Sequence, residues 1–351
     1  MGRKLLWASL VLAPITILLR YGFHVGDTAL FVAAAAALVP LAWLIGEATE
    51  HAGEHTGPGI GGFLNASFGN APELIIALFA VNESLPNVVR GSLAGSVVSN
   101  ILLVLGAALI FGGNGKDGKP LDRFSILLQL GLVLGAVLLF LVPSVPSWTG
   151  DAERHSLAVL SIPVSIVLLL VYAATTVRGL RRHKRLHEES GAMPGGGWSL
   201  PVSLGVLAAA TVVTALISET LVHSLHSFAE SAGLSEFFIA TVIVAIVGNA
   251  AEHGGAIVIA SRGKLPLASE IAVSSSAQVA LFVTPAVALL AWVVKPALPL
   301  SFRPIELAAM GGAALMVAIL LGDGRGRRWE GFLLVAVYGG VALAFLAAGD
   351  R

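Results

Sequence analysis

Two glutamates combine a chemically active side chain with a repeated sequence context. Glu73 and Glu252 each end a G-N-A-x-E pattern, and the two patterns lie 179 residues apart. Each glutamate sits near the middle of a long apolar segment, where an ionised carboxylate costs several kcal/mol unless it is protonated, faces water or is paired with a cation. Because no Lys or Arg lies at a similar depth in any apolar segment, the pattern favours a bound cation over a structural salt bridge.

Amide side chains recur at matching places around both glutamates. Asn70 and Asn249 stand three residues before them, and Asn100 and Gln278 follow them by 27 and 26 residues, each after a run of small residues that contains serine. Glycine and proline next to the glutamates favour interrupted helices, whose freed carbonyl groups can also bind a cation. Carboxylate, amide and carbonyl oxygens together suit a hard divalent cation, namely Ca²⁺, Mg²⁺ or Mn²⁺.

The same pair of carboxyl groups predicts coupling to protons. Without a cation, burial and the mutual repulsion of two like charges favour the protonated form of each group. A divalent cation would stabilise both ionised forms and displace the protons, so that the two ligands exclude each other. We therefore expect Glu73 and Glu252 to be both cation ligands and proton carriers.

The composition shows what must position these residues. The chain has 351 residues, of which 56% are hydrophobic and only 12% are charged. Such a chain cannot cover itself with a water-facing surface, so we expect most of the surface to face a lipid bilayer. The formal net charge is zero and cysteine is absent, so the composition indicates no nucleic-acid partner and excludes thiolate metal sites.

The apolar segments predict an all-α polytopic membrane protein with about eleven transmembrane helices. A basic start makes a signal peptide an alternative for the first span, but no clear cleavage site follows, and we expect the span to be retained. The predicted spans are approximately 5–22, 28–49, 58–82, 87–112, 123–146, 155–178, 199–222, 236–260, 266–294, 303–322 and 330–348.

The repeated pattern divides the chain into two similar halves. We expect a leading helix at 1–25, a first five-span repeat at 26–178, a flexible cytoplasmic linker at 179–198 and a second five-span repeat at 199–351. Because five is odd, the two repeats would cross the membrane in opposite directions. Inverted repeats that meet near the midplane are typical of secondary transporters. A duplication kept only for packing is the alternative, but packing does not require carboxylates at matching depths.

The distribution of Lys and Arg predicts the orientation. With the N-terminus in the cytoplasm, fifteen Lys and Arg residues fall on the inner side and six, Arg90 among them, on the outer side. This asymmetry follows the positive-inside rule. Since the compact, Ala- and Gly-rich chain suggests a prokaryote, we expect a multi-pass protein of the inner membrane.

Two longer segments resemble a known family. The pattern G-P-x-x-G-G-x-L-N-A-x-F-G-N-A-x-E-L from Gly57 to Leu74 is similar to the first repeat motif of the cation/proton exchanger branch of the Ca²⁺/cation antiporter superfamily. The segments 233–236, 246–253 and 276–285 resemble its second motif. The resemblance implies Ca²⁺ and protons as the substrates, no cofactor, and Glu73 and Glu252 as the transport carboxylates. It also implies that Asn70, Asn249 and Gln278 line the site.

Two other kinds of transport remain open from the residues. A Na⁺-coupled exchanger would share the architecture, although such relatives tend to carry Thr-Ser where this chain has Asn-Ala. A passive cation channel would show flux without a counter-ion gradient.

Acidic and histidine residues outside the repeated motif form two further groups. We expect a gate or vestibule near the cytoplasmic end of the second span and a counterpart near the outer end of the seventh span. For both groups, a solvated helix end is the simpler alternative. His253, beside Glu252, could relay protons or be a hydrogen-bonded interior histidine. The gate or vestibule candidates are Glu47, Glu50, Glu54, Glu219, His223, Glu230 and His253.

The segment from His51 to His55 also matches H-x-x-E-H, a zinc peptidase signature. The match is short, and it lies at the end of a membrane span without a soluble catalytic domain around it. We therefore expect a transporter and not an enzyme.

Overall fold

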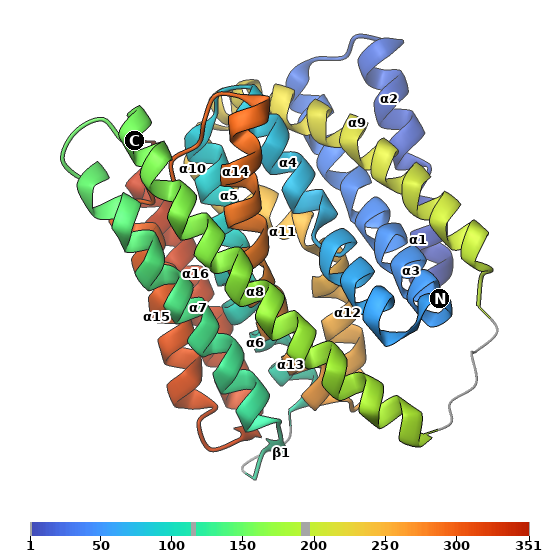
Figure 1. Ribbon diagram of the computed structural model, residues 1–351. Coiled ribbons are helices and arrows are strands. Elements are labelled where there is room, and N and C mark those ends of the chain that lie inside the picture. Colours follow the sequence, from blue (N-terminus) through green and yellow to red (C-terminus); the bar gives the residue numbers. More distant parts are fainter. Residues whose placement is uncertain (1, 114–116, 191–196, 351) are drawn as a thin grey trace.

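The computed structural model describes residues 2–113, 117–190 and 197–350, and it shows an almost entirely helical chain (Figure 1). Eight of its helices are long and apolar enough to cross a membrane, and one further pair of helices forms a span only if its bend is included. The two shorter apolar helices, Ala71–Asn82 and Pro304–Leu320, fall within the remaining predicted spans. The protein is therefore an all-α, multi-pass membrane protein, and the count of eleven spans stays a prediction.

The two halves contain the same order of elements. After the leading helices α1 (Gly2–Ser9) and α2 (Leu12–Tyr21), each half has a long first helix, a broken second span, a third span with a π-helical turn, and two further spans. The first half comprises α3 (Asp27–Phe68), α4 (Ala71–Asn82), α5 (Pro86–Ser99), η1 (Asn100–Val104), α6 (Leu105–Gly112), α7 (Arg123–Ser144) and α8 (His155–Ser190). The second comprises α9 (Leu200–Ala232), α10 (Glu236–Phe238), η3 (Ile239–Val244), α11 (Ala245–Gly248), α12 (Ala250–Ser261), α13 (Leu265–Gln278), η4 (Val279–Val283), α14 (Thr284–Val294), α15 (Pro304–Leu320) and α16 (Arg328–Ala348).

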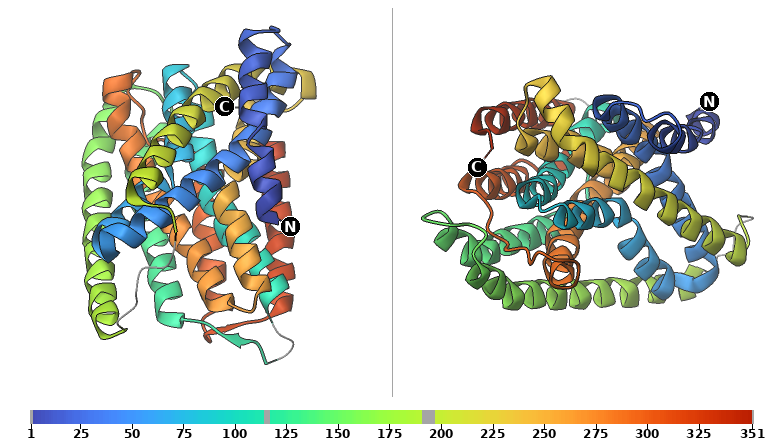
Figure 2. Two further views of the ribbon diagram at one scale, coloured as in Figure 1. Left: turned by 90° about the vertical axis from the view of Figure 1, so that its right-hand side faces the viewer. Right: turned by 90° about the horizontal axis from the view of Figure 1, so that it is seen from above.

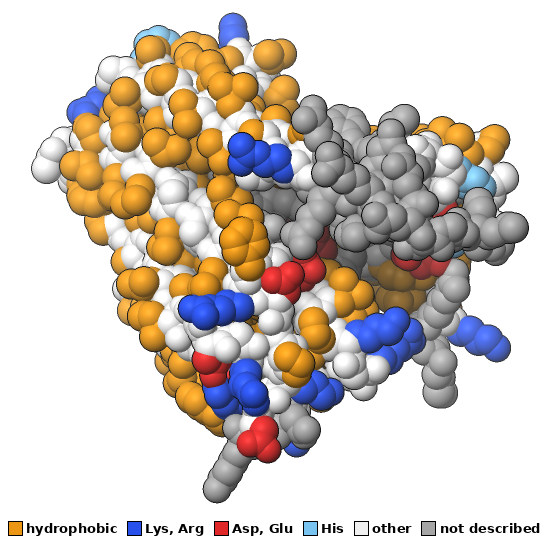
Figure 3. All heavy atoms as spheres, turned by 60° about the horizontal axis from the view of Figure 1, so that its bottom comes forward, with side chains coloured by type: hydrophobic (Ala, Val, Ile, Leu, Met, Phe, Trp, Pro, Cys, Tyr) orange, Lys and Arg blue, Asp and Glu red, His pale blue; other side chains and the backbone are white. Residues whose placement is uncertain are grey.

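Three short elements complete the chain. A 3₁₀ turn, η2 (Val145–Ser147), follows α7, and the strands β1 (Lys119–Pro120) and β2 (Arg325–Gly326) pair antiparallel. This pairing joins the loop before α7 to the loop before α16. The same end of the molecule carries several exposed basic side chains (Figure 3).

The predicted boundary between the second and third spans is wrong. We expected separate spans at 28–49 and 58–82, whereas α3 continues without interruption to Phe68 and the break comes at Gly69–Asn70. A continuous helix keeps the backbone N–H and C=O groups of these residues paired, which a loop inside the bundle would not. The side chains at 57–63, 65 and 66, part of the first family motif, lie outside the described residues.

The linker at 179–198 is only partly a loop. Helix α8 extends to Ser190, so the basic run that follows Arg178 belongs to a helix, whereas 191–196 lies outside the described residues. The predicted flexible linker therefore begins at least twelve residues too early.

Helices α3 and α9, the first helices of the two halves, lie side by side (Figures 1 and 2). At one end of this pair the rings of Phe31 and Phe228 stack with their centroids 4.2 Å apart. Nearby, the hydroxyl of Ser227 donates a hydrogen bond to Asp27 at 2.9 Å. The leading helix α2 packs along both α3 and α9.

Helix α5 forms the centre of the bundle, because every residue from Val88 to Ser99 is buried. Small residues let neighbouring backbones approach it closely, as is usual between membrane helices. The closest approach is at Gly95, where a β-carbon would overlap the carbonyl group of Thr241 in η3. Gly95 thus fixes the distance between the third span of one half and the broken span of the other.

Arg90, which was predicted to lie on the outer side at the start of its span, is buried inside the bundle. Its guanidinium, 1% exposed, donates to Glu153 at 2.6 Å, to Asn87 at 2.9 Å and to Ser301 at 3.0 Å. Since Glu153 and Ser301 are distant in sequence, Arg90 ties the start of α5 to two loops at this end of the bundle.

The packing at Gly95 predicts a large difference between two glycine-to-alanine substitutions. Gly95→Ala forces α5 away from η3, and overpacking of this kind costs about 1–3 kcal/mol or more. Gly135→Ala in α7 is the control, because a β-carbon there meets no atom within 4 Å. We expect Gly95→Ala to lower the thermal unfolding temperature in detergent and Gly135→Ala to leave it unchanged or raise it. Equal unfolding temperatures would contradict the close approach.

Candidate cation-binding site

The two repeated glutamates occupy the same position at two helix starts. Asn70 caps α4 and Asn249 caps α12, with nearly identical backbone angles of φ −98°, ψ 14° and φ −93°, ψ 10°. Glu73 and Glu252 are then the third residues of their helices. The chain bends by 58° between the helices on either side of Asn249. Each carboxylate thus lies in a helix's first turn, where the macrodipole stabilises negative charge.

The four predicted amide residues meet as two pairs that cross between the halves. Asn70 donates to Gln278 at 2.8 Å, and Asn100 donates to Asn249 at 3.1 Å. Asn70 and Asn249 correspond to each other in the repeat, as do Asn100 and Gln278. The two bonds are therefore equivalent contacts of a two-fold arrangement, and the structure brings together all four amides.

Glu252 belongs to a directed chain of hydrogen bonds. The hydroxyl of Ser275 donates to a carboxylate oxygen of Glu252, and Ser275 accepts from the amide of Asn100 at 3.0 Å. The oxygen of Asn100 lies 3.1 Å from Nε2 of His253. Because that oxygen can only accept, His253 must donate there. His253 is 9% exposed and thus lies in the site itself, not in a vestibule.

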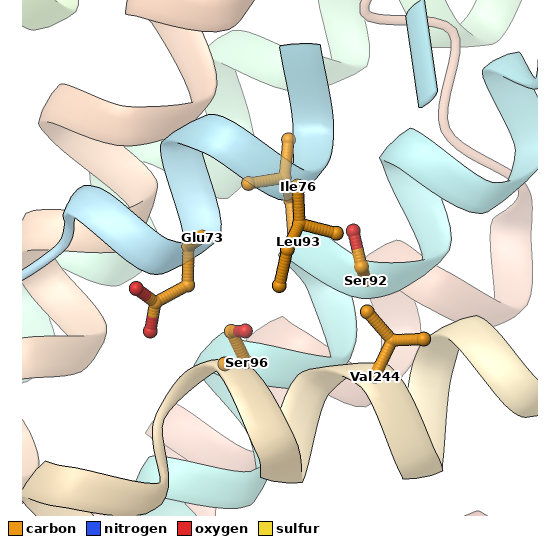
Figure 4. A pocket seen from close by; sticks show the side chains of 7 residues that line it. Glu73, Ile76, Ser92, Leu93, Ser96 and Val244 are labelled. Carbon is orange, nitrogen blue, oxygen red and sulfur yellow. The ribbon is translucent and has the colours of Figure 1, made fainter. Parts of the chain in front are cut away.

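Glu73 has a different environment from Glu252. It is 6% exposed, and within the described part of the chain its Oε2 atom has no hydrogen-bond partner. It borders a cavity of about 10 Å³, shared with Ser92, Ser96 and Gly248 (Figure 4). That volume holds about one water molecule. In the first half, the repeat position that corresponds to His253 is occupied by Leu74.

The donor set fits a hard cation. Glu73 borders the same small cavity as Ser96, which accepts a hydrogen bond from Asn249 of the other glutamate's motif, and amide and hydroxyl oxygens surround both carboxylates. Within residues 2–113, 117–190 and 197–350, no three His, Asp or Glu side chains come together as a metal cluster. Carboxylate, amide and hydroxyl oxygens are the ligand types that a hard divalent cation prefers, and Glu73, Glu252 and the neighbouring amides and serines supply all three.

Two serines at this site were not among the predicted residues. Ser96 accepts a hydrogen bond from Asn249 at 2.7 Å, and Ser275 donates to Glu252. Both follow their repeat glutamate by 23 residues. This shared spacing is a signal that could have identified them within the small-residue runs.

The predicted gate residues on α3 surround a histidine. His51 lies 3.6 Å from Glu47 and 3.4 Å from Glu54, and its ring packs on Trp198 with centroids 4.9 Å apart. Glu50 is exposed and is not part of these contacts. The cluster therefore joins α3 to the residues just before α9.

The zinc peptidase signature does not form a zinc site among the described residues. His55 contacts the backbone oxygen of Trp198 at 2.6 Å, and His51 contacts carboxylates of its own helix. A catalytic zinc needs three converging protein ligands. The two histidines instead connect the second half of α3 to Trp198.

The predicted gate residues on α9 do not form one cluster, because Glu219 and Glu230 take part in separate contacts. Glu219 forms an ion pair with Arg20 of α2 at 3.0 Å, and the neighbouring Thr220 accepts from the same guanidinium at 2.8 Å. Glu230 lies 3.4 Å from His226, which also contacts Glu236 of α10 at 2.5 Å. His223 is exposed. Glu219 thus anchors the leading helix, a role that the spacing along α9 did not indicate.

These features define a class of protein: a multi-pass membrane protein with two similar halves and a buried pair of carboxylates at matching helix breaks. A sequence profile of the family described as sodium/calcium exchanger protein matches residues 27–178 and 202–347. The chain belongs to this family, and the resemblance to its cation/proton exchanger branch is confirmed by the relatives.

The relatives cover nearly the whole chain. The Ca(2+)/H(+) antiporter ChaA of Bacillus subtilis is 40% identical over 329 residues, which are 92% of this chain and 93% of that protein. The Ca(2+)/H(+) antiporter of Aphanothece halophytica is 35% identical over 354 residues, with 96% and 94% covered.

Solved structures show the same fold. Native YfkE superposes with a TM-score of 0.83 at 36% identity, covering 97% of this chain and 99% of that one. The H+/Ca2+ exchanger CAX reaches a TM-score of 0.71 at 16% identity, covering 99% and 91%, and supports the fold alone.

The contact between α2 and α9 predicts an energetic coupling between Arg20 and Glu219. Both side chains are partly shielded from water, with exposed fractions of 16% and 37%. We expect a double-mutant cycle of Arg20→Gln and Glu219→Gln, measured by unfolding in detergent, to give about 0.5–1 kcal/mol. A control cycle of Arg20→Gln with Glu230→Gln should be additive, because Glu230 contacts His226 instead. Additivity in both cycles would contradict a tether.

Proposed function

We propose that this protein is a secondary active antiporter that exchanges Ca²⁺, or a similar divalent cation, for protons. The observation that carries the proposal is the pair of glutamates at equivalent helix starts, one from each half, linked by reciprocal amide contacts. The relatives named Ca(2+)/H(+) antiporter support the same substrates. No cofactor is required, since the carboxyl groups can carry both substrates.

The cation binds between Glu73 and Glu252, with Asn70, Asn249, Asn100 and Gln278 supplying further oxygens or orienting the carboxylates. A divalent cation neutralises the two negative charges, which otherwise repel each other in surroundings that solvate them poorly. When the cation leaves, protonation removes the same charges. An empty and ionised site is the costly state, and avoiding it couples the release of one substrate to the binding of the other.

The unequal surroundings of the two carboxylates give them different parts in this cycle. The hydroxyl of Ser275 donates to Glu252, and a donated hydrogen bond stabilises the ionised form of a carboxylate. Within the described residues Glu73 has no such donor on Oε2, and it is more buried than Glu252. Glu252 is therefore the cation ligand whose carboxylate a hydrogen bond holds in position, and Glu73 completes the site from the side of the small cavity. Two carboxyl groups correspond to about two protons per cation.

The helix breaks provide a route to alternating access. Gly69–Asn70 and Asn249 allow α4 and α12 to tilt relative to the helices before them, and the π-helical turns η1 and η4 lie beside Asn100 and Gln278. Breaks and π-turns of this kind cluster at functional sites in membrane transporters. The cluster of Glu47, His51 and Glu54 on α3 forms the gate at one end of the cation's route. The protein acts in a prokaryotic inner membrane with its N-terminus in the cytoplasm.

Glu73→Gln and Glu252→Gln should each abolish exchange, because glutamine can neither carry a proton nor neutralise the cation. The measurement is Ca²⁺ uptake into liposomes with an acidic interior and no Na⁺. Glu83→Gln is the matched control, since Glu83 is an exposed carboxylate at the other end of α4. Uptake by either site variant at the wild-type rate refutes the assigned roles. Uptake that needs a Na⁺ gradient would change the coupling ion, and flux without any counter-ion gradient would indicate a channel.

Ser275→Ala should weaken cation binding without abolishing exchange. The lost hydrogen bond to Glu252 is worth about 0.5–1.5 kcal/mol, which corresponds to a rise of about two- to tenfold in the Ca²⁺ concentration that half-saturates uptake. Ser274→Ala is the control, because the hydroxyl of Ser274 donates to the backbone oxygen of Ile271. The same half-saturating concentration in both variants would show that Ser275 does not support Glu252.

A further inference from the structure

A hollow of about 500 Å³, lined by both polar and apolar side chains, lies at the end of the bundle opposite to β1, away from the paired glutamates. It is lined by the end of α4, the start of α8 and the segment after α14. The lining residues are Asn82, Ser84, His155, Trp292, Lys295, Pro296 and Ala297. The volume is large enough for the phosphate-containing headgroup of a lipid, which the proposed transport function does not require.

The chemistry of the lining favours an anion. Among the described residues that line the hollow, Lys295 carries a fixed positive charge and none is acidic, although Glu83 stands between two of them in the sequence. Lys295 is exposed and forms no ion pair within the part of the chain that the structure describes. The amide of Asn82, the hydroxyl of Ser84 and the ring of His155 can donate hydrogen bonds beside it. A cation would be repelled here, so the hollow is not part of the cation's route.

The position favours a lipid over a soluble anion. His155 begins a membrane-spanning segment and Trp292 ends another, and their rings contact each other with centroids 5.4 Å apart. Tryptophan at the end of a span is typical of the membrane–water interface. Exposed apolar side chains are neighbours of the lining residues on both helices. Val159, one turn after His155, is 45% exposed, and Val293, next to Trp292, is 80% exposed. These side chains would contact acyl chains.

We propose that this hollow binds the phosphate of an anionic phospholipid, with Lys295 and His155 as its main ligands and Val159 and Val293 against the acyl chains. The bound lipid joins the far ends of α4 and α14. Helix α4 begins at the cation site, and α14 continues the span that contains Gln278. The lipid thus contacts two of the spans that carry the cation ligands.

The test is thermal unfolding of the purified full-length protein in maltoside detergent with added dioctanoyl phosphatidylglycerol. Dioctanoylglycerol provides the acyl chains without phosphate, and glycerol 3-phosphate provides the phosphate without acyl chains. We expect only the complete lipid to raise the unfolding temperature of the wild type.

The variants locate the site. Loss of charge-assisted hydrogen bonds in Lys295→Gln with His155→Gln should raise the half-saturating lipid concentration about tenfold. Lys264→Gln is the control, because Lys264 is also an exposed lysine at a helix end but lies just before α13, outside the hollow. It should bind the lipid like the wild type.

Two results would overturn the proposal. If the double variant and the control respond equally to the lipid, the binding is not in this hollow. If glycerol 3-phosphate alone stabilises the wild type as strongly as the lipid does, the ligand is a soluble phosphate. Neither measurement depends on transport, so each is independent of the proposed exchange of Ca²⁺ for protons.

Discussion

The structure depends on one constraint: two carboxylates must be kept inside an apolar bundle without a basic partner among the described residues around them. An isolated ionised carboxylate is unstable there. Two breaks in otherwise continuous helices meet this constraint. They place Glu73 and Glu252 in the first turn of α4 and α12 and free polar groups of the backbone at the same points. The breaks would be costly in a membrane if they faced lipid, so the surrounding spans must cover them.

Helix α5 provides much of that cover. Its buried residues Ser92 and Ser96 lie at the site, as does Asn100 directly after it in η1. Gly95 allows η3 of the other half to approach α5 directly. A larger residue at that point would separate the halves and lengthen the contact between Ser96 and Asn249. Small residues such as Gly95 therefore allow the two halves to come within hydrogen-bonding distance of each other.

Much of this arrangement could be predicted from the sequence, because the repeat is encoded locally. The G-N-A-x-E patterns specify the break, the cap and the glutamate within five residues, and the amide positions follow at similar distances in both halves. The ends of the spans were harder to predict. Separate spans were expected at 28–49 and 58–82, yet α3 continues to Phe68, since an unbroken helix keeps its backbone groups paired in the bundle.

Contacts between distant parts of the chain could not be predicted. Arg90 was predicted only to lie on the outer side of the membrane, and its burial depends on Glu153 and Ser301, which are 63 and 211 residues away. The pairing of Arg20 with Glu219 is similar, because the sequence indicated Glu219 only as a candidate gate or vestibule residue or as part of a solvated helix end. In both cases the local sequence gives no sign of the partner, since the contact exists only once the spans are packed.

The reciprocal amide contacts connect this packing to a transport cycle. The bond from Asn70 to Gln278 joins α4 to α13, and the bond from Asn100 to Asn249 joins the end of α5 to the break before α12. In the proposed cycle, opening the site toward either side of the membrane would separate the halves and strain both bonds. Because broken bonds would leave buried polar groups without partners, these contacts would oppose the movement. Bound protons or a bound cation would remove the further cost of moving ionised carboxylates within the apolar bundle, so the cycle would favour movement of the loaded site over movement of the empty, charged one.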